Sequence, residues 1–308
     1  MNRRVARLLV WLRAHQTRLT AGFTVLVLLI AGFALRELLR DLSLDRLREA
    51  IAAVTGHQIL LSLLLTALSY LVLTGYDVLA LHALGKPQRY WRAALGSFSA
   101  YCFSHNLGFA PITGAAARWR AYRGTTLDAA DIARIVVIAG VTFWLGIFLL
   151  LGIFLVIAPG ALRIHDRVMP FALQATIGAA ILVAMSAYLV ACTRQTGPLD
   201  ILGWRLPVPT LRQALLQFGL AATDIAIASA ALLVLLPESS WQAYPDFVIA
   251  YVVAMVVALL THSPGGLGVF EAVVLVTLPQ VDKATLVSAL LLYRVIYYWL
   301  PLALAAAL

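Results

Sequence analysis

Charged residues are scarce in this sequence. Only 12% of its 308 residues are Asp, Glu, Lys or Arg, whereas 62% are hydrophobic and the mean hydropathy is +0.92. A soluble domain usually carries about 25% charged residues, because it must cover its surface with polar groups. The composition therefore excludes an ordinary soluble protein and predicts one that is embedded in a membrane.

Cysteine is also scarce, and the common motifs for metals and nucleotides are missing. Cys102 and Cys192 lie in separate apolar segments, so we expect neither a disulfide framework nor a thiolate metal site. No HExxH, CxxC or Walker A pattern occurs. Ser104 and His105 are sequence neighbours, which is not the arrangement of a catalytic triad. We expect no metal, no other cofactor and no ATP-driven step.

The net charge of +9 is carried almost entirely by arginine, because Lys86 and Lys283 are the only lysines. Cytoplasmic loops of membrane proteins are rich in Arg and Lys, so we interpret this charge as a topology signal and expect no nucleic-acid partner. The stretch "MNRRVARLLVWLRAHQTR" is basic and amphipathic, and no cleavage site follows it. We expect a cytoplasmic segment over residues 1–20 and one transmembrane domain over residues 21–308.

Long apolar segments dominate that domain, and the alternation typical of transmembrane strands is missing. A helix of about 20 apolar residues crosses the hydrocarbon core. Residues 36–53 have leucines at helical spacing and balanced charge, which predicts a short interfacial helix. We predict an all-α polytopic membrane protein with apolar segments at about 21–35, 59–83, 93–113, 132–158, 170–192, 211–236, 247–278 and 284–308.

The basic loops predict that two of these segments do not cross. Residues 85–92 and 118–134 flank the segment 93–113, and both are rich in arginine. A crossing helix would place one of them outside, so we expect this segment to enter and leave from the cytoplasmic face. The segment 247–278 would do the same from the other face and leave both termini inside. About six full spans and two re-entrant or broken hairpins are therefore expected.

The two exceptional segments share the pattern [ST]-H-x-x-G. It occurs in "SHNLGFAP", residues 104–111, and in "THSPGGLG", residues 261–268. Each hairpin lies between two crossing segments, which predicts two units of opposite orientation with a binding site near the midplane. We expect a half-helix to begin at Pro264, capped by Thr261 or Ser263, with its free N–H groups suited to phosphate.

Ionisable residues occur deep inside the apolar segments. They are Asp77, Asp224, Glu271 and Arg294. An uncompensated charge there costs at least ~2.5–3.5 kcal/mol, so each should face a partner or a polar cavity. One alternative is a set of structural ion pairs, for example Glu271 with Arg294. Three acids against one base would instead require protons or a visiting cation. Arg118, just after the first hairpin, either anchors the topology or binds a lipid phosphate at the cytoplasmic mouth.

Several of these stretches resemble one known family. They are "YDVLALHALGKP", "SHNLGFAPITGAAARWRAYRG", "VTFWLG", "THSPGGLGVFE" and "LLYRVIYYWLP". From about residue 20 to the end, the chain resembles the transmembrane region of the lysylphosphatidylglycerol synthase/flippase family, also called multiple peptide resistance factor. The resemblance implies a bacterial inner-membrane protein that flips aminoacylated phosphatidylglycerol and so exposes cationic lipid to resist antimicrobial peptides. It also implies functional polar groups at Asp77, Arg118, Asp224 and Glu271.

Full-length members of that family carry a soluble synthase domain after the membrane region. This sequence stops just past its last apolar segment, so we expect no synthase activity and no enzyme. Its expected partners are a phospholipid substrate, a separate aminoacyl-lipid synthase and a second copy of the chain.

The leading hypothesis is a flippase for aminoacylated phosphatidylglycerol or a related phospholipid, in which acids hold an ammonium group and arginines hold a phosphate. A membrane scaffold for a lipid-modifying enzyme and a small-solute secondary transporter are the alternatives. A scaffold would pair its polar groups internally, and a small-solute carrier would have a cavity closed to the bilayer. The candidate substrate-binding residues are Asp77, His105, Asn106, Arg118, Asp224, His262, Gly265, Gly266, Glu271 and Arg294.

Overall fold

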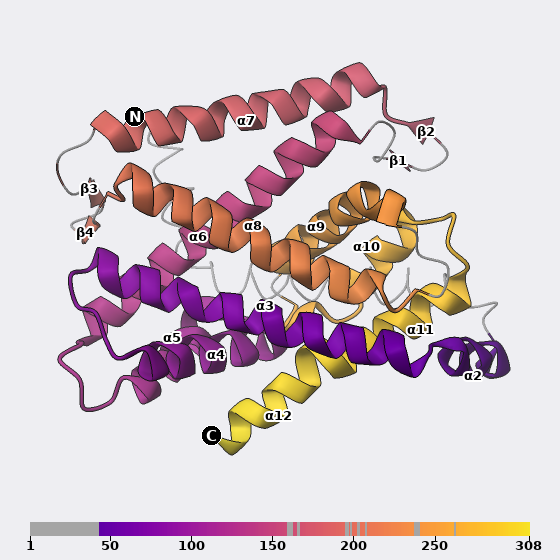
Figure 1. Ribbon diagram of the computed structural model, residues 1–308, viewed down its shortest axis with the longest axis horizontal. Coiled ribbons are helices and arrows are strands. Elements are labelled where there is room, and N and C mark those ends of the chain that lie inside the picture. The colour runs from indigo at the N-terminus through magenta and orange to yellow at the C-terminus, as the bar shows by residue number, and fades with distance from the viewer. Residues whose placement is uncertain are drawn as a thin grey trace, which may run out of the picture.

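The computed structural model describes residues 43–158, 163–164, 167–194, 197, 199–201, 204–206, 208–236, 241–261 and 263–308 (Figure 1). The expected cytoplasmic segment 1–20, the apolar segment 21–35 and the candidate residue His262 lie outside these ranges. In the part that is described, six helices are long and apolar enough to cross a membrane. The prediction of an all-α polytopic membrane protein is confirmed.

The helices follow the predicted segments closely. The first half of the chain forms α2 (Leu44–Ala53), α3 (Gly56–Ala83), α4 (Tyr90–Leu107), α5 (Ala110–Ala121), α6 (Ala129–Ile157) and α7 (Phe171–Arg194). The second half forms α8 (Leu211–Leu233), the 3-10 turn η1 (Trp241–Ala243), α9 (Tyr244–Leu260), the 3-10 turn η2 (Pro264–Gly266), α10 (Val269–Thr277), α11 (Lys283–Tyr293), the π-helix η3 (Arg294–Trp299) and α12 (Leu300–Ala307).

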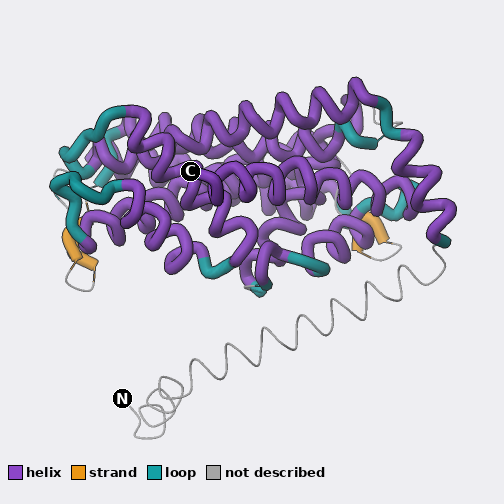
Figure 2. The backbone as a smooth tube through the Cα atoms, turned by 90° about the horizontal axis from the view of Figure 1, so that it is seen from below, coloured by secondary structure: helices purple, strands orange, loops and turns teal. Residues whose placement is uncertain are grey.

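Two small antiparallel strand pairs flank α7. They are β1 (Arg163–Ile164) with β2 (Arg167–Val168), and β3 (Leu199–Ile201) with β4 (Trp204–Leu206). The β1–β2 and β3–β4 pairs lie near the two ends of α7, which extends along much of the helical body (Figure 1). The helices together form an elongated body (Figure 2), in which α6 runs obliquely to α3 and α8 (Figure 1).

Helices α3 and α8 begin with the same local structure. Thr55 and Gln58 form a capping box, in which the Thr55 N–H donates to Gln58 Oε1 at 2.8 Å and the Gln58 N–H donates to Thr55 Oγ1 at 3.3 Å. Thr210 and Gln213 repeat it at 2.9 and 3.3 Å. The same T-x-x-Q sequence therefore satisfies the orphan N–H groups at both helix starts.

The two capped helices lie side by side and antiparallel (Figure 1). Ser62 Oγ donates to the Ala231 carbonyl at 2.8 Å, and Ser69 Oγ donates to Asp224 Oδ1 at 2.6 Å. Residues later in α3 thus bond to residues earlier in α8, as antiparallel helices require. Ser69 and Asp224 occupy equivalent places, since one follows its capping threonine from 55 to 69 and the other from 210 to 224. At this point the two helices contact each other through equivalent positions.

The remaining helices repeat this relation. In the first unit α3 packs on α4 and α6, and α4 packs on α5; in the second, α8 packs on α9 and α11, and α9 packs on α10. Helix α6 reaches across to α8 and α9, and its counterpart, the α11–η3–α12 helix, reaches across to α3 and α4. These contacts of one unit have counterparts in the other, and α7 packs in addition on α6 and α8. This packing is that of two units with opposite orientation.

Each unit contains a helical hairpin, and the tips of the two hairpins touch. The first, α4–α5, turns at Gly108 and Phe109, whose φ angles of 71° and 48° are left-handed. The second, α9–α10, turns through Gly265, Gly266 and Gly268. A Cβ on Gly265, where φ is 62°, would lie 3.1 Å from the Asn106 carbonyl oxygen. Only glycine suits that conformation and approach.

The start of the second half-helix differs from the prediction. Helix α10 begins at Val269 with Gly268 as its N-cap, whereas Pro264 lies in the preceding 3-10 turn. Thr261 does not cap it, because its hydroxyl donates to the Ala258 carbonyl at 2.8 Å at the end of α9. The positive φ angles of the three glycines displace the helix start by several residues.

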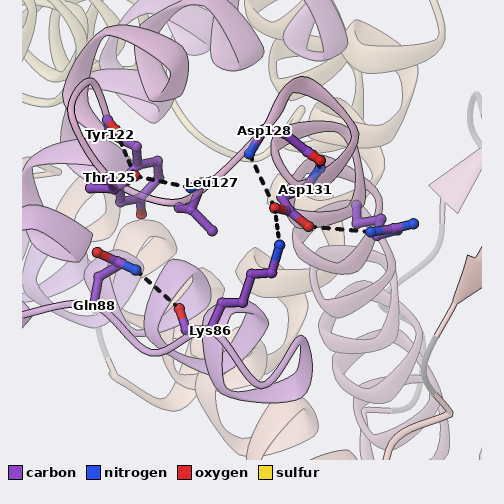
Figure 3. A network of polar contacts seen from close by, with 8 residues as sticks. Lys86, Gln88, Tyr122, Thr125, Leu127, Asp128 and Asp131 are labelled. Carbon is purple, nitrogen blue, oxygen red and sulfur yellow. Dashed lines mark hydrogen bonds and ion pairs between the residues drawn. The ribbon is translucent and has the colours of Figure 1, made fainter.

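Asp131 connects the segment that precedes the first hairpin to the helix that follows it. Its carboxylate accepts from Lys86 Nζ at 2.5 Å, from Arg134 Nη1 at 3.2 Å and from the Asp128 N–H at 3.1 Å (Figure 3). Lys86 lies between α3 and α4, and Asp131 lies in the first turn of α6. One carboxylate therefore joins the segments on both sides of the hairpin.

Helix α6 crosses α8 at a glycine. A Cβ on Gly146 would lie only 2.7 Å from the carbonyl carbon of Ala221, whereas nothing lies within 4 Å of a Cβ on Gly140 of the same helix. The close crossing therefore depends on the missing side chain at Gly146.

We expect Gly146→Ala to lower stability by about 1–3 kcal/mol, because the methyl group must push the two helices apart. The matched variant Gly140→Ala should be neutral or stabilise by up to about 1 kcal/mol, since alanine favours helix. Thermal unfolding in detergent measures both. Equal melting temperatures for the two variants would contradict the close crossing.

Candidate functional site

Asp77 and Arg118 form a buried ion pair between α3 and α5. Arg118 Nη2 lies 2.7 Å from Asp77 Oδ1, and Arg118 Nε lies 3.0 Å from both carboxylate oxygens. The Tyr122 hydroxyl donates to Asp77 Oδ2 at 2.7 Å. The Asp77 side chain is 0% exposed and that of Arg118 is 5% exposed, so the pair is desolvated. Such a pair is stable only while both partners are present.

The sequence interpretation offered Arg118 either as a topology anchor or as a phosphate ligand at the cytoplasmic mouth, and the structure adds its buried pairing with Asp77. Arg118 and Tyr122 are four residues apart at the end of α5, so both reach Asp77 from one helical face. Two glycines make room for them. A Cβ on Gly114 would lie 3.2 Å from Arg118 Nη1, and one on Gly96 would lie 2.8 Å from the Tyr122 hydroxyl. The hairpin is thus shaped around the pair.

Glu271 and Arg294 form the second deep ion pair. Arg294 Nε donates to Glu271 Oε1 at 2.6 Å, and Arg294 Nη1 donates to the Gly265 carbonyl. Glu271 Oε2 accepts from the Gly268 N–H at 2.8 Å. The pair therefore satisfies backbone groups on both sides of the break between α9 and α10. The sequence analysis included a structural ion pair between Glu271 and Arg294 as one alternative, and the structure contains this pair.

His105 and Asn106 lie at the tip of the first hairpin. The His105 ring is surrounded by Tyr70, Tyr101, Tyr297 and Tyr298, with ring centroids 5.7–6.4 Å away. Its Nδ1 atom is buried and has no hydrogen-bond partner within the described ranges. The neighbouring tip also brings Gly265 within reach of the His105 carbonyl. The two hairpin tips and the Glu271–Arg294 pair therefore form one cluster.

Asn106 connects this cluster to the π-helix. Its Nδ2 donates to the Cys102 carbonyl at 2.8 Å and to the Tyr298 carbonyl at 3.1 Å. Pro301 lacks the N–H that would bond to the Tyr297 carbonyl four residues earlier. That carbonyl instead accepts from the Tyr70 hydroxyl at 3.1 Å. Side chains of α3 and α4 thus stabilise the irregular helix.

Asp224 lies apart from both ion pairs. Its carboxylate accepts from Ser69 Oγ at 2.6 Å and from the Tyr76 hydroxyl at 3.5 Å, and the residue is 4% exposed. Ser69 Oγ also lies 2.8 Å from the Tyr297 hydroxyl. A serine in an apolar helix carries no charge signal, so Ser69 is not among the residues that the sequence analysis singles out. The sequence does contain one indication of its importance. Ser69 lies as far after the T-x-x-Q motif of α3 as Asp224 lies after that of α8.

The candidate residues thus fall into three places. Asp77 and Arg118 lie between α3 and α5, and Asp224 lies at the contact of α3 and α8. Gly266 follows Gly265 in the glycine turn, and His262 lies outside the described ranges. No group of three or more His, Cys, Asp or Glu side chains that could hold a metal ion occurs in the described part of the chain. The hairpin-tip cluster holds His105, Asn106, Gly265, Glu271 and Arg294.

Removing one partner of the first ion pair should be costly. We expect Asp77→Asn or Arg118→Gln alone to destabilise the protein by about 3–5 kcal/mol, because each leaves a buried charge without its partner. The double variant should recover much of that loss, which a double-mutant cycle of melting temperatures measures. Arg120→Gln, on the exposed side of the same helix, should change stability by less than about 0.5 kcal/mol. Additive losses in the double variant would argue against the pair.

Comparison of the sequence with known proteins identifies its family. The family model for the lysylphosphatidylglycerol synthase TM region matches residues 19–305. The uncharacterized protein slr0712 of Synechocystis is 36% identical over 239 residues, which cover 77% of this chain and 74% of that protein. The inner membrane protein YbhN of Escherichia coli is 30% identical over 247 residues, which cover 78% of this chain and 76% of that protein. The chain therefore belongs to the family defined by the lysylphosphatidylglycerol synthase transmembrane region.

Proposed function

We propose that this protein is a flippase that moves a phospholipid, of the aminoacylated phosphatidylglycerol class, between the leaflets of a bacterial inner membrane. Membership of the family supports the lipid class, and the inner-membrane relative supports the location. The observation that carries the proposal is the pair of buried ion pairs, each joining the returning limb of a hairpin to a neighbouring helix.

A headgroup with two opposite charges suits such pairs. Opening a buried ion pair leaves both partners unsatisfied, which is unfavourable unless each finds a substitute. A cation alone would replace only the arginine, and an anion alone only the carboxylate. An aminoacyl phospholipid carries an ammonium group for Glu271 or Asp77 and a phosphate for Arg294 or Arg118. It therefore replaces both partners at once.

The hairpin-tip cluster is the place where we expect the headgroup to bind. Arg294 Nη2 is buried and has no hydrogen-bond partner among the described residues, so a donor remains there for a phosphate oxygen. The Arg294 guanidinium also lies 4.5 Å from the Tyr298 ring centroid, which keeps it in position while its carboxylate partner moves. Acyl chains would stay in the surrounding lipid.

We further propose that the protein acts after a separate synthase, without enzymatic activity of its own. Lipid exposed on the outer leaflet would reduce its negative charge and weaken attraction for cationic antimicrobial peptides. The basic segments that carry Lys86, Arg89 and Arg92, and later Arg120 and Arg123, would face the cytoplasm, as would both termini.

Cysteine labelling tests this topology. We expect Pro87→Cys and Thr126→Cys, on the two sides of the first hairpin, to react with an impermeant maleimide only from the cytoplasmic face. Gln280→Cys, in the α10–α11 loop, should react only from the opposite face, because the hairpins enter from opposite sides. The background variant replaces both native cysteines by serine. Labelling of Pro87→Cys and Thr126→Cys from different faces would show that the first hairpin crosses.

A leaflet-resolved flipping assay tests the transport function. In vesicles containing lysylphosphatidylglycerol, we expect the wild-type protein to expose new ammonium groups to an impermeant amine reagent. Glu271→Gln should slow this by at least about tenfold, because a loss of 1.4 kcal/mol in headgroup binding already has that effect. Glu49→Gln, an exposed acid of α2, should match the wild type. Equal flipping rates for Glu271→Gln and Glu49→Gln would show that transport does not require the charge of Glu271.

The internal pairing also favours a second candidate, a membrane scaffold that binds a lipid-modifying enzyme. Both ion pairs are complete without any ligand, which is what a scaffold requires. The same assay separates the two candidates. Wild-type vesicles without flipping, together with binding of the chain to a purified aminoacyl-lipid synthase, would favour the scaffold.

A further inference from the structure

Asp224 is a buried carboxylate that has no cationic partner among the described residues. Asp77 is paired with Arg118 and Glu271 with Arg294, whereas no Lys, Arg or His of the described ranges forms an ion pair with Asp224. Its two oxygens meet only neutral hydroxyls, those of Ser69 at 2.6 Å and Tyr76 at 3.5 Å. An ionised carboxylate in this place would be poorly compensated at bilayer depth.

The other titratable groups around Asp224 do not supply a charge. Those that interact with it electrostatically are tyrosines, whose ordinary pKa near 10 leaves them neutral at physiological pH. Helix α6, which packs against α8 through Thr142 and Gln217, brings its acidic and basic groups to its far end, where Asp131 holds Lys86 and Arg134. The tyrosines come from α3, α4, α9 and the π-helix and are Tyr70, Tyr76, Tyr101, Tyr251 and Tyr297. Two more lie beside α8 and hydrogen-bond to other groups of it, Tyr188 of α7 to Gln217 and Tyr293 of α11 to the Ala228 carbonyl.

Asp224 lies where a change in its charge would affect the contact between the two units. Ser69 and Asp224 are the equivalent positions of the two units, and their hydrogen bond lies where α3 and α8 meet. Ser69 also contacts the Tyr297 hydroxyl at 2.8 Å, and the Tyr297 ring is stacked on His105 at the tip of the first hairpin. Movement of one unit against the other must therefore change the surroundings of Asp224.

We propose that Asp224 is a proton-binding site, and that one proton is bound there while α3 and α8 are packed and is released when they separate. In the packed state Oδ1 accepts from Ser69, and Oδ2 carries the proton. On separation the O–H bond breaks, the proton passes to water as hydronium, and the carboxylate remains hydrated. The transport consequence rests on the proposed flippase function: each change between the two orientations of the units is coupled to release or uptake of one proton.

Infrared spectroscopy tests the bound proton without reference to transport. In vesicles, the wild-type protein should show the carbonyl band of a protonated carboxyl group, shifted in D2O, and Asp224→Asn should lack it. Asp282→Asn, which removes an exposed carboxylate at the start of α11, should retain the band. An unchanged band in Asp224→Asn would overturn the proposal. Failure of Asp224→Asn to fold would overturn it as well, because a neutral amide should replace a neutral acid without loss.

The flipping assay tests the coupling. Below the midpoint of proton release, the deprotonated fraction rises about tenfold per pH unit, so wild-type flipping should accelerate as the pH rises. Asp224→Asn cannot release the proton and should flip at a rate that no longer depends on pH, whereas Asp282→Asn should behave as the wild type. Unchanged pH dependence in Asp224→Asn would overturn the coupling. Absence of flipping by the wild type at every pH would instead defeat the proposed function and its coupling, while the infrared band still decides the proton site.

Discussion

Backbone groups that lie at bilayer depth must find partners within the protein, and the rest of this structure depends on that constraint. Two apolar segments are interrupted, at Gly108 and in the glycine turn before α10, and a third helix is distorted before Pro301. Side chains supply the missing bonds. Asn106 donates to the Tyr298 carbonyl, Arg294 to the Gly265 carbonyl, and Glu271 accepts from the Gly268 N–H. The polar residues at the hairpin tips therefore have a structural role before they have any other.

This dual role makes internal pairing compatible with the proposed transport. Arg294 binds Glu271 and a backbone carbonyl with two of its nitrogens, and its third nitrogen has no partner in the described part of the chain. A headgroup phosphate that bound there would add to the network before it replaced any member of it. Tyr122 donates a further hydrogen bond to Asp77, and no buried side-chain atom of Asp77 or Arg118 is among those without a partner in the described part of the chain. The two pairs thus differ, and the hairpin-tip pair is the one that a ligand can open stepwise.

The sequence predicted the hairpins better than the positions of the charges in them. Basic loops on both sides of residues 93–113 predicted a re-entrant segment, and glycine with proline located both breaks. The returning limb, however, runs to Ala121 as helix α5, eight positions beyond the expected end at Thr113. Hydropathy ends that segment early because "ARWRAYR" reads as a polar loop. Pairing with Asp77 neutralises Arg118, and this long-range contact, which no local pattern contains, lets the helix continue. The displaced start of α10 has a different, local cause, which is the positive φ angles of the three glycines before it.

The contact between Ser69 and Asp224 shows how an inverted repeat benefits from unequal sequences. Two units related by an approximate two-fold axis bring equivalent positions of α3 and α8 together. Identical carboxylates at those positions would repel each other, and identical alanines would leave nothing polar at the centre. A hydroxyl opposite a carboxyl group instead forms a hydrogen bond of 2.6 Å between the units. Because that bond joins the two halves directly, it holds one orientation of the units, and the protonation of Asp224 determines how easily the orientation is left.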